Sequence, residues 1–290
     1  MALSQIIIGL FVAASFPSAP LTSQSSAERK TVQISIDVNA AVLITTSNHK
    51  QIGFDSRANK SVNEIPEARI LERENSQIFI LPYVKSGEEY TLAISGKETT
   101  QSANISMTGP GFIIGIRNLT LRAGEIQTVS LLPGAPHVAI IPDREGSAPT
   151  LFITMQSDRS RPSYRFEVTP SPLARGKGMW MELDMSREWL FFGSAETVRS
   201  DETKKSSFSI LMRRTNPGGT RDVYTHRDVS LASNNLYRMQ FGEWDGKGDL
   251  RFCYARGNGE IKAGTTRPPR DWPEMFCTPL KNETAPMKFN

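Results

Sequence analysis

The chain has 290 residues, of which 38% are hydrophobic and 22% are charged, so it has enough apolar side chains for one or two globular cores. The formal net charge of +4 comes from residues 148–290, which hold 22 Lys and Arg against 17 Asp and Glu. These basic residues are mixed with acidic ones, which argues against a nucleic-acid-binding track. For an exported protein they favour an anionic surface polymer as the electrostatic partner.

The first 27 residues carry no charged side chain and include the short apolar run Ile6–Ala14. This run is too short to span a bilayer. The small residues Ser25–Ala27 stand directly before the charged Glu28–Lys30, which is typical of a signal-peptide cleavage site. We therefore expect residues 1–27 to be a signal peptide and the mature protein to be periplasmic or extracellular, without a membrane span. The alternative is a buried strand or short helix at the N-terminus.

From residue 28 onwards, short apolar segments alternate in the manner of half-buried strands and are separated by Gly, Pro, Asn and Ser. Up to residue 141, the predicted strands are 32–38, 41–46, 76–83, 89–95, 103–108, 112–116, 126–132 and 137–141. One segment differs, because Glu64–Glu74 is rich in helix formers and Pro66 suits the first turn of a short helix. The turn-rich residues 143–149 then predict a linker.

Strand patterns resume at residue 150. The predicted strands of the second half are 150–156, 163–168, 179–184, 188–192, 206–213, 229–231, 236–241 and 249–254. The spacing of these segments predicts an all-β protein of two antiparallel β-sandwich-like domains in tandem, residues 28–142 and 150–265. Prolines punctuate the chain from Arg267 on, so residues 266–290 are predicted to form an irregular tail.

The chain has two cysteines, Cys253 and Cys277. In an oxidising compartment an even number of cysteines most simply forms disulfides. The alternatives are two free thiols or half of a metal site, although no histidine follows His226 to complete a metal site. A disulfide would tie the C-terminal tail to the strand that holds Cys253.

The stretch Tyr237–Glu260 predicts a hairpin whose two strands are joined by the glycine-rich turn Trp244–Asp249. Tyr237, Met239 and Phe241 alternate, so we expect them to form one buried face. Asp245 and Asp249 supply too few oxygen ligands for calcium, and Lys247 lies between them. We therefore expect no metal here, and interpret the stretch as a structural hairpin with an exposed edge around Trp244.

Catalytic motifs are not evident. His49, His137 and His226 are far apart in the sequence and are expected to be surface or turn residues. The chain has no G-x-S-x-G nucleophile motif and no H-E-x-x-H or C-x-x-C metal motif. We therefore expect neither a metal nor a cofactor. Each of the four tryptophans, Trp180, Trp189, Trp244 and Trp272, is expected to pack in the core or at a strand edge, and the alternative is an exposed Trp that stacks on sugars.

Three stretches resemble a β-sandwich module of bacterial exported proteins: Ile52–Asp55 with Val62–Ala68 (IGFD and VNEIPEA), Gly87–Gly96, and Tyr237–Gly248. The resemblance implies a β-sandwich fold, export, and an accessory or cell-surface role without catalysis of its own. Such modules often continue with an aspartate-rich, calcium-like loop. This chain has Arg256–Glu260 at that place, so the resemblance implies no calcium site here.

The predicted function is a non-enzymatic interaction or accessory module that presents loops from a rigid sandwich to a protein or glycan partner at the cell envelope or outside the cell. Trp244, Asp245, Asp249 and Trp272 are the candidate binding residues. One alternative is a hydrolase that acts on a surface polysaccharide or peptide with acids of the second domain. Another is a structural envelope protein without a small ligand. Two carboxylates facing each other in a deep cleft would indicate the hydrolase.

Overall fold

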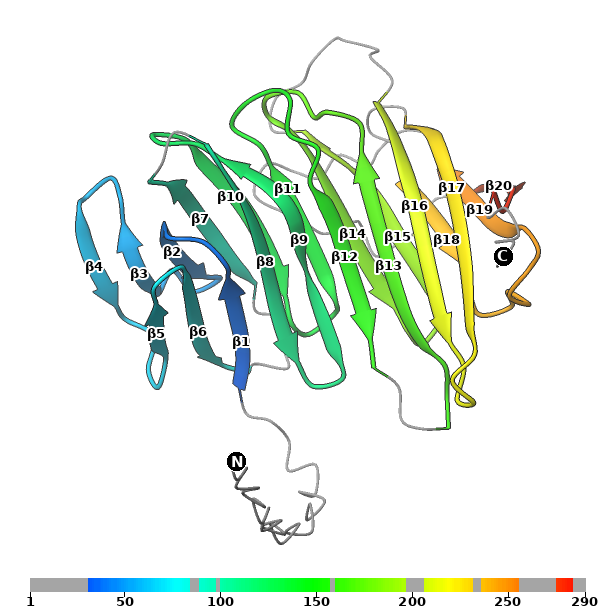
Figure 1. The fold of residues 1–290 in the computed structure, drawn as a ribbon, viewed down its shortest axis with the longest axis horizontal. Coiled ribbons are helices and arrows are strands. Elements are labelled where there is room, and N and C mark those ends of the chain that lie inside the picture. The colour runs from blue at the N-terminus through cyan, green and yellow to red at the C-terminus, as the bar shows by residue number, and fades with distance from the viewer. Residues whose placement is uncertain are drawn as a thin grey trace, which may run out of the picture.

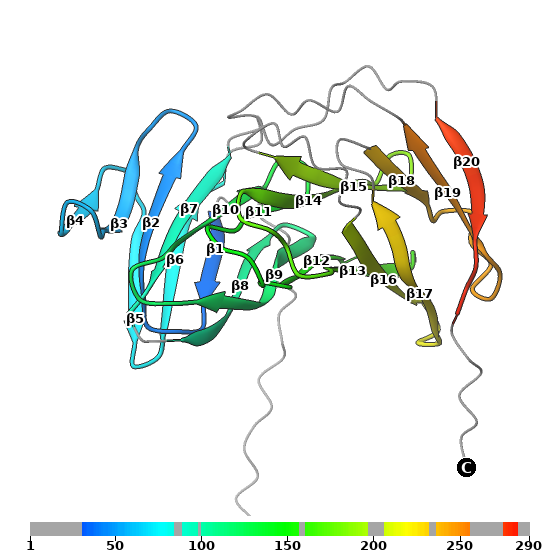
Figure 2. The ribbon, with the colours of Figure 1, turned by 90° about the horizontal axis from the view of Figure 1, so that it is seen from above.

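The computed structural model describes residues 31–83, 89–97, 100–156, 160–196, 206–231, 236–255 and 275–283. All regular structure in these residues is β-strand, in two antiparallel sheets that form the two layers seen in Figures 1 and 2. The predicted all-β class is therefore confirmed. The expected signal peptide lies outside the described residues, and export stays a prediction.

The first layer is a nine-stranded sheet and the second an eleven-stranded sheet. In spatial order the nine-stranded sheet consists of β17 (Arg221–Leu231), β16 (Ser206–Thr215), β13 (Ser163–Pro170), β12 (Thr150–Met155), β9 (Phe112–Leu121), β8 (Gln101–Gly109), β1 (Thr31–Ile36), β6 (Ser76–Pro82) and β5 (Arg69–Arg73). The eleven-stranded sheet consists of β20 (Phe276–Leu280), β19 (Leu250–Ala255), β18 (Leu236–Gln240), β15 (Trp189–Glu196), β14 (Lys177–Asp184), β11 (His137–Ile141), β10 (Ile126–Leu132), β7 (Tyr90–Gly96), β2 (Ala40–Thr46), β3 (Gln51–Asp55) and β4 (Lys60–Asn63).

The hydrophobic core lies between the two sheets. In β1 every second residue is buried, and in β13 the same alternation continues along the whole strand, because successive side chains of a strand point to opposite faces. The inward side chains of both sheets form one cluster that extends from Val32 to Phe252. Aromatic rings connect the layers: Phe166 of β13 lies 4.8 Å from Phe241, and Phe208 of β16 lies 4.9 Å from Phe192 of β15, both between ring centroids.

The two predicted domains share both sheets. In the nine-stranded sheet β9 pairs with β12, with Ile114 opposite Ile153. In the eleven-stranded sheet β11 pairs with β14, with Val138 opposite Met181. The predicted linker, residues 143–149, connects β11 to β12 and so crosses from one sheet to the other. Strand pairing and the hydrophobic cluster therefore continue past this loop, and each half contributes strands to both layers.

The helix predicted at Glu64–Glu74 is wrong. The chain turns at Pro66 and Glu67, where Glu67 has a φ of 63°, and then forms the edge strand β5 against β6. Four of the five β5 residues are exposed. Pairing with β6 therefore determines the backbone conformation of this segment and overrides the intrinsic helix preference of its residues. The sequence patterns also did not predict β3 or β4. No described segment is a helix long and apolar enough to cross a membrane.

The C-terminal tail is only partly irregular, because Phe276–Leu280 form β20 along the edge of β19. The chain then crosses to β17 in the other sheet. There the Tyr224 hydroxyl donates to the carbonyl of Leu280 at 3.1 Å, and the Glu283 amide donates to the carbonyl of Thr225 at 2.8 Å. Residues 276–283 therefore bridge the edges of the two sheets at this end of the sandwich.

The predicted disulfide is present between β19 and β20. Cys253 and Cys277 stand directly opposite each other, with their Cα atoms 4.0 Å apart. Four of the five β20 side chains are exposed, so burial contributes little to holding this strand in place. The disulfide therefore adds a covalent link to the backbone pairing that holds β20 on β19.

Removing the disulfide should lower stability. For Cys253→Ser/Cys277→Ser we expect the free energy of unfolding to fall by about 2 to 3 kcal/mol, because the unfolded chain regains the freedom of a closed loop. Urea denaturation of the oxidised wild type and the double variant measures this difference. A reductant should bring the wild type to the stability of the variant. Equal stability of the oxidised wild type and the variant would show that the bond does not support the fold.

Candidate functional site

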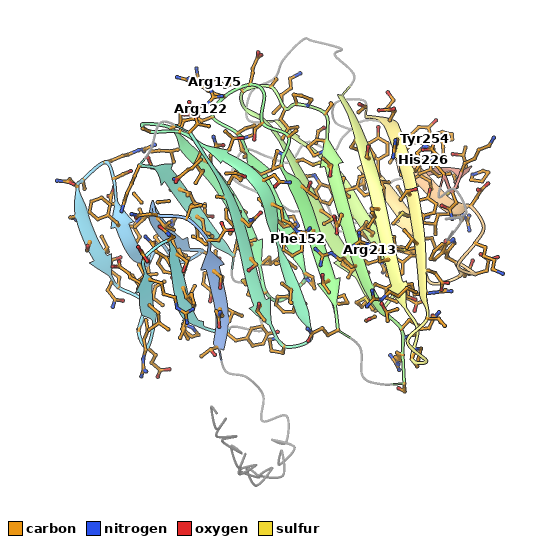
Figure 3. The ribbon with its side chains drawn as sticks, in the orientation of Figure 1. Arg122, Phe152, Arg175, Arg213, His226 and Tyr254 are labelled. Atoms are coloured by element: carbon orange, nitrogen blue, oxygen red, sulfur yellow. A yellow bond between two sulfur atoms is a disulfide. The ribbon has the colours of Figure 1, made fainter. Side chains whose placement is uncertain are left out.

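An arginine patch lies on the outer face of the nine-stranded sheet, and Figure 3 shows two of its members, Phe152 and Arg213, near the middle of that face. The patch consists of Arg117 on β9, Phe152 on β12, Arg165 and Glu167 on β13, and Arg213 on β16. On each strand a residue next to the patch residue is buried, namely Ile116, Ile153, Phe166 or Met212, so strand alternation turns the patch side chains away from the core.

The side chains of the patch are held in place by each other. The guanidinium carbons of Arg117 and Arg165 lie 5.0 and 5.4 Å from the centroid of the Phe152 ring. Glu167 Oε1 accepts hydrogen bonds from Arg165 Nε at 2.7 Å and from Arg117 Nη2 at 3.3 Å, and lies 3.9 Å from Arg213 Nη1. Cation–π contact and shared ion pairing therefore orient the three guanidiniums around one ring and one carboxylate.

The patch keeps an excess of positive charge. Three arginines surround the single carboxylate of Glu167, which leaves a formal charge of +2. The Arg213 side chain is 50% exposed and that of Glu167 only 15%, so the anion lies beneath the cations. Arg165 and Arg213 are also directly opposite each other on neighbouring strands. Like charges in that position destabilise a sheet, so the fold gains little from this pair.

The chemistry of the patch is that of an anion-binding surface. Each guanidinium carries five N–H donors in a planar fork that matches carboxylate, sulfate and phosphate groups. Arg165 uses its Nε for Glu167, which leaves the outer donors of the fork directed away from that carboxylate. Next to Phe152 on β9 stands Gly115, whose position has no side chain to interrupt the face. The patch is therefore rich in donors for an anionic group.

The sequence patterns did not bring these residues together. Arg117 and Arg213 are nearly a hundred positions apart and meet only through the pairing of four adjacent strands, β9, β12, β13 and β16. One signal was available, the Arg165–Glu167 pair, whose members are two positions apart and so lie on one face of β13. The segment Thr150–Met155 has no alternation that marks Phe152, because its first four residues are all buried.

The predicted exposed edge around Trp244 is wrong, because the side chain is only 4% exposed. The turn between β18 and β19 folds over the end of the sandwich. There Trp244 Nε1 donates to the carbonyl of Gly248 at 2.9 Å, and the ring meets Tyr224 edge-on at 6.1 Å between centroids. The indole is therefore part of the core and has no face available for a ligand. The hairpin itself, with Tyr237, Met239 and Phe241 buried, is confirmed.

Asp245 and Asp249 close the turn and attach the tail. Asp245 Oδ1 accepts hydrogen bonds from the amides of Gly248 at 2.7 Å and Lys247 at 2.8 Å, and these bonds lower the pKa of the Asp245 carboxyl. Asp249 Oδ1 accepts the amide of Asn282 at 3.0 Å. Trp272 and the Arg256–Glu260 loop lie outside the described residues.

Arg214 joins this turn to the nine-stranded sheet. Its Nη2 and Nε donate to Asp222 Oδ2 at 2.8 and 3.0 Å, and its Nη1 donates to the carbonyl of Trp244. The guanidinium carbon also lies 5.1 Å from the centroid of the Trp244 ring. The Arg214 side chain is 14% exposed, against 50% for its neighbour Arg213 on the other face. Arg214 therefore serves the fold, and Arg213 faces solvent.

The Asp222 carboxyl should make the unfolding free energy depend on pH under acidic conditions. Burial alone would raise its pKa, but hydrogen bonds from Arg214 and Asn216 hold the pKa below the ordinary value of 3.8. A carboxyl with a lowered pKa in the folded state adds stability above its ordinary pKa, and that stability is lost as the pH falls through the lowered value. We expect Asp222→Asn to flatten the fall in unfolding free energy below about pH 4, measured by urea denaturation. The same acid dependence in variant and wild type would contradict this role.

The three histidines do not form a catalytic group. His49 lies in a turn with a φ of 65°, as expected. His137 is fully buried, which corrects the prediction of a surface residue: its Nδ1 lies 3.2 Å from Glu182 Oε2, and its ring stacks on Trp180. His226 Nδ1 lies 2.9 Å from the carbonyl of Lys281 in the bridging tail.

Potential metal ligands do not gather in the part of the chain that the structure describes, where no group of three or more His, Cys, Asp or Glu is suitably placed.

Comparison with known proteins identifies no relative: no family model, no curated protein and no solved structure matches the chain. The resemblance to modules of bacterial exported proteins stays a prediction.

Proposed function

We propose that this protein is an exported, non-enzymatic binding module whose arginine patch contacts an acidic polymer, such as a glycan that carries carboxylate or sulfate groups. The observation that carries the proposal is the set of Arg117, Arg165 and Arg213, partly exposed on one sheet face around a single carboxylate. The fold gains little from opposing two of these charges across neighbouring strands. An anionic ligand would relieve that repulsion and engage the guanidinium forks.

Export is supported by two features. The Cys253–Cys277 disulfide favours export, since disulfides persist mainly in oxidising compartments and cytosolic thiols are kept reduced. Residues 1–27 carry no charged side chain and have the apolar run and small residues of a signal peptide. An envelope or extracellular location would place the arginine patch among acidic polysaccharides and other anionic surface polymers.

No observed geometry favours the alternative of a hydrolase. Three acids of the second half serve as acceptors that hold local structure. Glu167 is bound by arginines of the patch, and Asp222 is bound by Arg214 and Asn216. Asp184 Oδ1 accepts the amide and the hydroxyl of Ser186 at 2.9 and 2.6 Å. None of these three contacts joins two carboxylates across a cleft, which a hydrolase of this kind would need.

Calorimetric titration with polymers of different charge tests the proposal. Polygalacturonate and heparin supply carboxylate and sulfate groups, and dextran is the neutral control. We expect both acidic polymers to bind and dextran not to bind. The affinity should fall as salt is raised from about 0.05 to about 0.3 M, because the contacts are exposed and screened. Equal binding of dextran, or binding of neither acidic polymer, would contradict the proposed function.

A further inference from the structure

The two cysteines of the disulfide differ in their access to solvent. Cys253 on β19 is fully buried, whereas Cys277 is exposed on the edge strand β20, which Figures 1 and 2 show at one end of the sandwich. Thiol–disulfide exchange begins when an external thiolate attacks one of the two sulfurs, and the other sulfur departs. Access therefore directs the attack to the Cys277 sulfur and makes the Cys253 sulfur the one that departs.

Arg238 stands beside the departing sulfur. It lies on β18 directly opposite Cys253, and its Nη2 donates to Cys253 Sγ at 3.5 Å. Its neighbours Tyr237 and Met239 belong to the core, so Arg238 lies on the outer face of the eleven-stranded sheet. Its guanidinium carbon is 4.1 Å from the centroid of the Trp189 ring, a cation–π contact that holds the group in place. The guanidinium is therefore positioned next to the bond.

Arg238 lacks the anion that a partly buried guanidinium usually has. In the part of the chain that the structure describes, no carboxylate pairs with Arg238, and its Nε–H group meets no acceptor. Burial and the nearby cations Arg251 and Arg187 lower the pKa of Arg238 from its ordinary value. A cation removed from water needs a partner of opposite charge. A thiolate at Cys253 would be that partner, so opening the disulfide compensates a charge that the intact bond leaves unpaired.

We propose that Cys253–Cys277 is an exchangeable disulfide that reacts with thiol reductants through Cys277. The reductant thiolate forms a bond to Cys277 Sγ, the S–S bond breaks, and its electron pair leaves on Cys253 Sγ as a thiolate beside the Arg238 guanidinium. A second reductant thiolate then attacks the reductant sulfur of this mixed disulfide. Cys277 leaves as a thiolate and takes up a proton, and the two reductant thiols end as a disulfide.

Reduction changes how the tail is held. Four of the five β20 side chains are exposed, so after reduction β20 keeps only its backbone pairing with β19 on this sheet. The hydrogen bonds of Leu280 and Glu283 to β17 remain on the other sheet. The site is therefore placed to loosen one edge strand without opening the core. It lies on the eleven-stranded sheet, and the arginine patch lies on the nine-stranded sheet, so the two proposals are tested separately.

Limited reduction of the native, oxidised full chain tests the direction of attack. Reduced glutathione is added in excess, the reaction is stopped with acid, and free thiols are blocked with N-ethylmaleimide in denaturant before peptide mapping by mass spectrometry. We expect the glutathione adduct on Cys277 and the maleimide on Cys253. A glutathione adduct on Cys253, or no reaction of the native chain, would overturn the inference.

Arg238→Met tests the role of the cation, because methionine keeps an unbranched side chain against Trp189 without the charge. We expect reduction of the native chain by dithiothreitol to slow by at least about threefold, because a thiol that departs without its cation has a higher pKa and leaves more slowly. A variant that only loosened the fold would expose the bond and speed the reaction. Slowing therefore reports the lost cation and not a damaged fold.

Arg187→Met is the matched control. Arg187 also lies over the Trp189 ring, at 5.3 Å from its centroid, but in the turn before β15 and not opposite Cys253. The rate of reduction should be unchanged in this variant. An Arg238→Met chain that is reduced as fast as wild type, or equal slowing by both variants, would show that the contact between Arg238 and the disulfide does not promote exchange.

Discussion

Replacing Arg165 and Arg213 together by alanine is expected to weaken the binding of polygalacturonate by about 10- to 100-fold, because hydrogen bonds to charged groups contribute about 1.5 to 3 kcal/mol each and less where they are exposed. Stability should fall by no more than about 1 kcal/mol, because partly exposed ion pairs with Glu167 are lost while a like-charge contact across β13 and β16 is relieved. Calorimetric titration and urea denaturation of the same preparation measure the two effects.

The control for this variant is Arg122→Ala/Arg175→Ala, which removes the same amount of charge elsewhere. Figure 3 shows both residues at the top of the view, away from Phe152 and Arg213. Their side chains are 43% and 77% exposed and form ion pairs with Glu125 and Asp143. Binding should change little in this control. Equal weakening by both double variants would show that net charge, and not the arginine patch, attracts the polymer.

Arg214→Ala is expected to cost about 3 to 5 kcal/mol of unfolding free energy, because it leaves Asp222 without its cation in a largely buried site and removes the cation from the face of Trp244. The turn between β18 and β19 would also lose its hydrogen bond from the nine-stranded sheet. Urea denaturation gives the free-energy difference, and a change in tryptophan fluorescence of the folded variant would report that the turn has loosened.

Arg213→Ala is the matched control, because the neighbouring residue has the same chemistry on the opposite face of β16. We expect a change in unfolding free energy within about 0.5 kcal/mol, as for most surface substitutions. The pair of variants therefore separates an arginine that serves the fold from one that serves binding. If Arg214→Ala were as harmless as Arg213→Ala, the junction of Arg214, Asp222 and Trp244 would not support the sandwich end.

Strand alternation made most of the fold predictable. The buried face of Tyr237, Met239 and Phe241 follows directly from a period of two, as do the buried positions of β1 and β13. The disulfide was predictable for a different reason, since two cysteines in an expected oxidising compartment have one simple arrangement.

Edge strands and end contacts were not predictable in this way. The residues of β4 and β5 are mostly exposed, so they carry no apolar alternation, and β5 forms only because β6 offers it hydrogen bonds. Trp244 begins a turn of glycines and charged residues that indicates exposure, yet tertiary packing against Tyr224 and Arg214 buries it. The arginine patch depends on which strands become neighbours, a property that no local pattern contains.

The central claim, that the arginine patch is the contact surface for an acidic polymer, is tested most directly by NMR of the arginine side-chain Nε–H groups during titration with polygalacturonate. We predict saturable shifts of the Arg117, Arg165 and Arg213 signals, with the signals of Arg122 and Arg175 unchanged. Uniform small shifts of all arginines, or saturable shifts confined to arginines outside the patch, would contradict the claim.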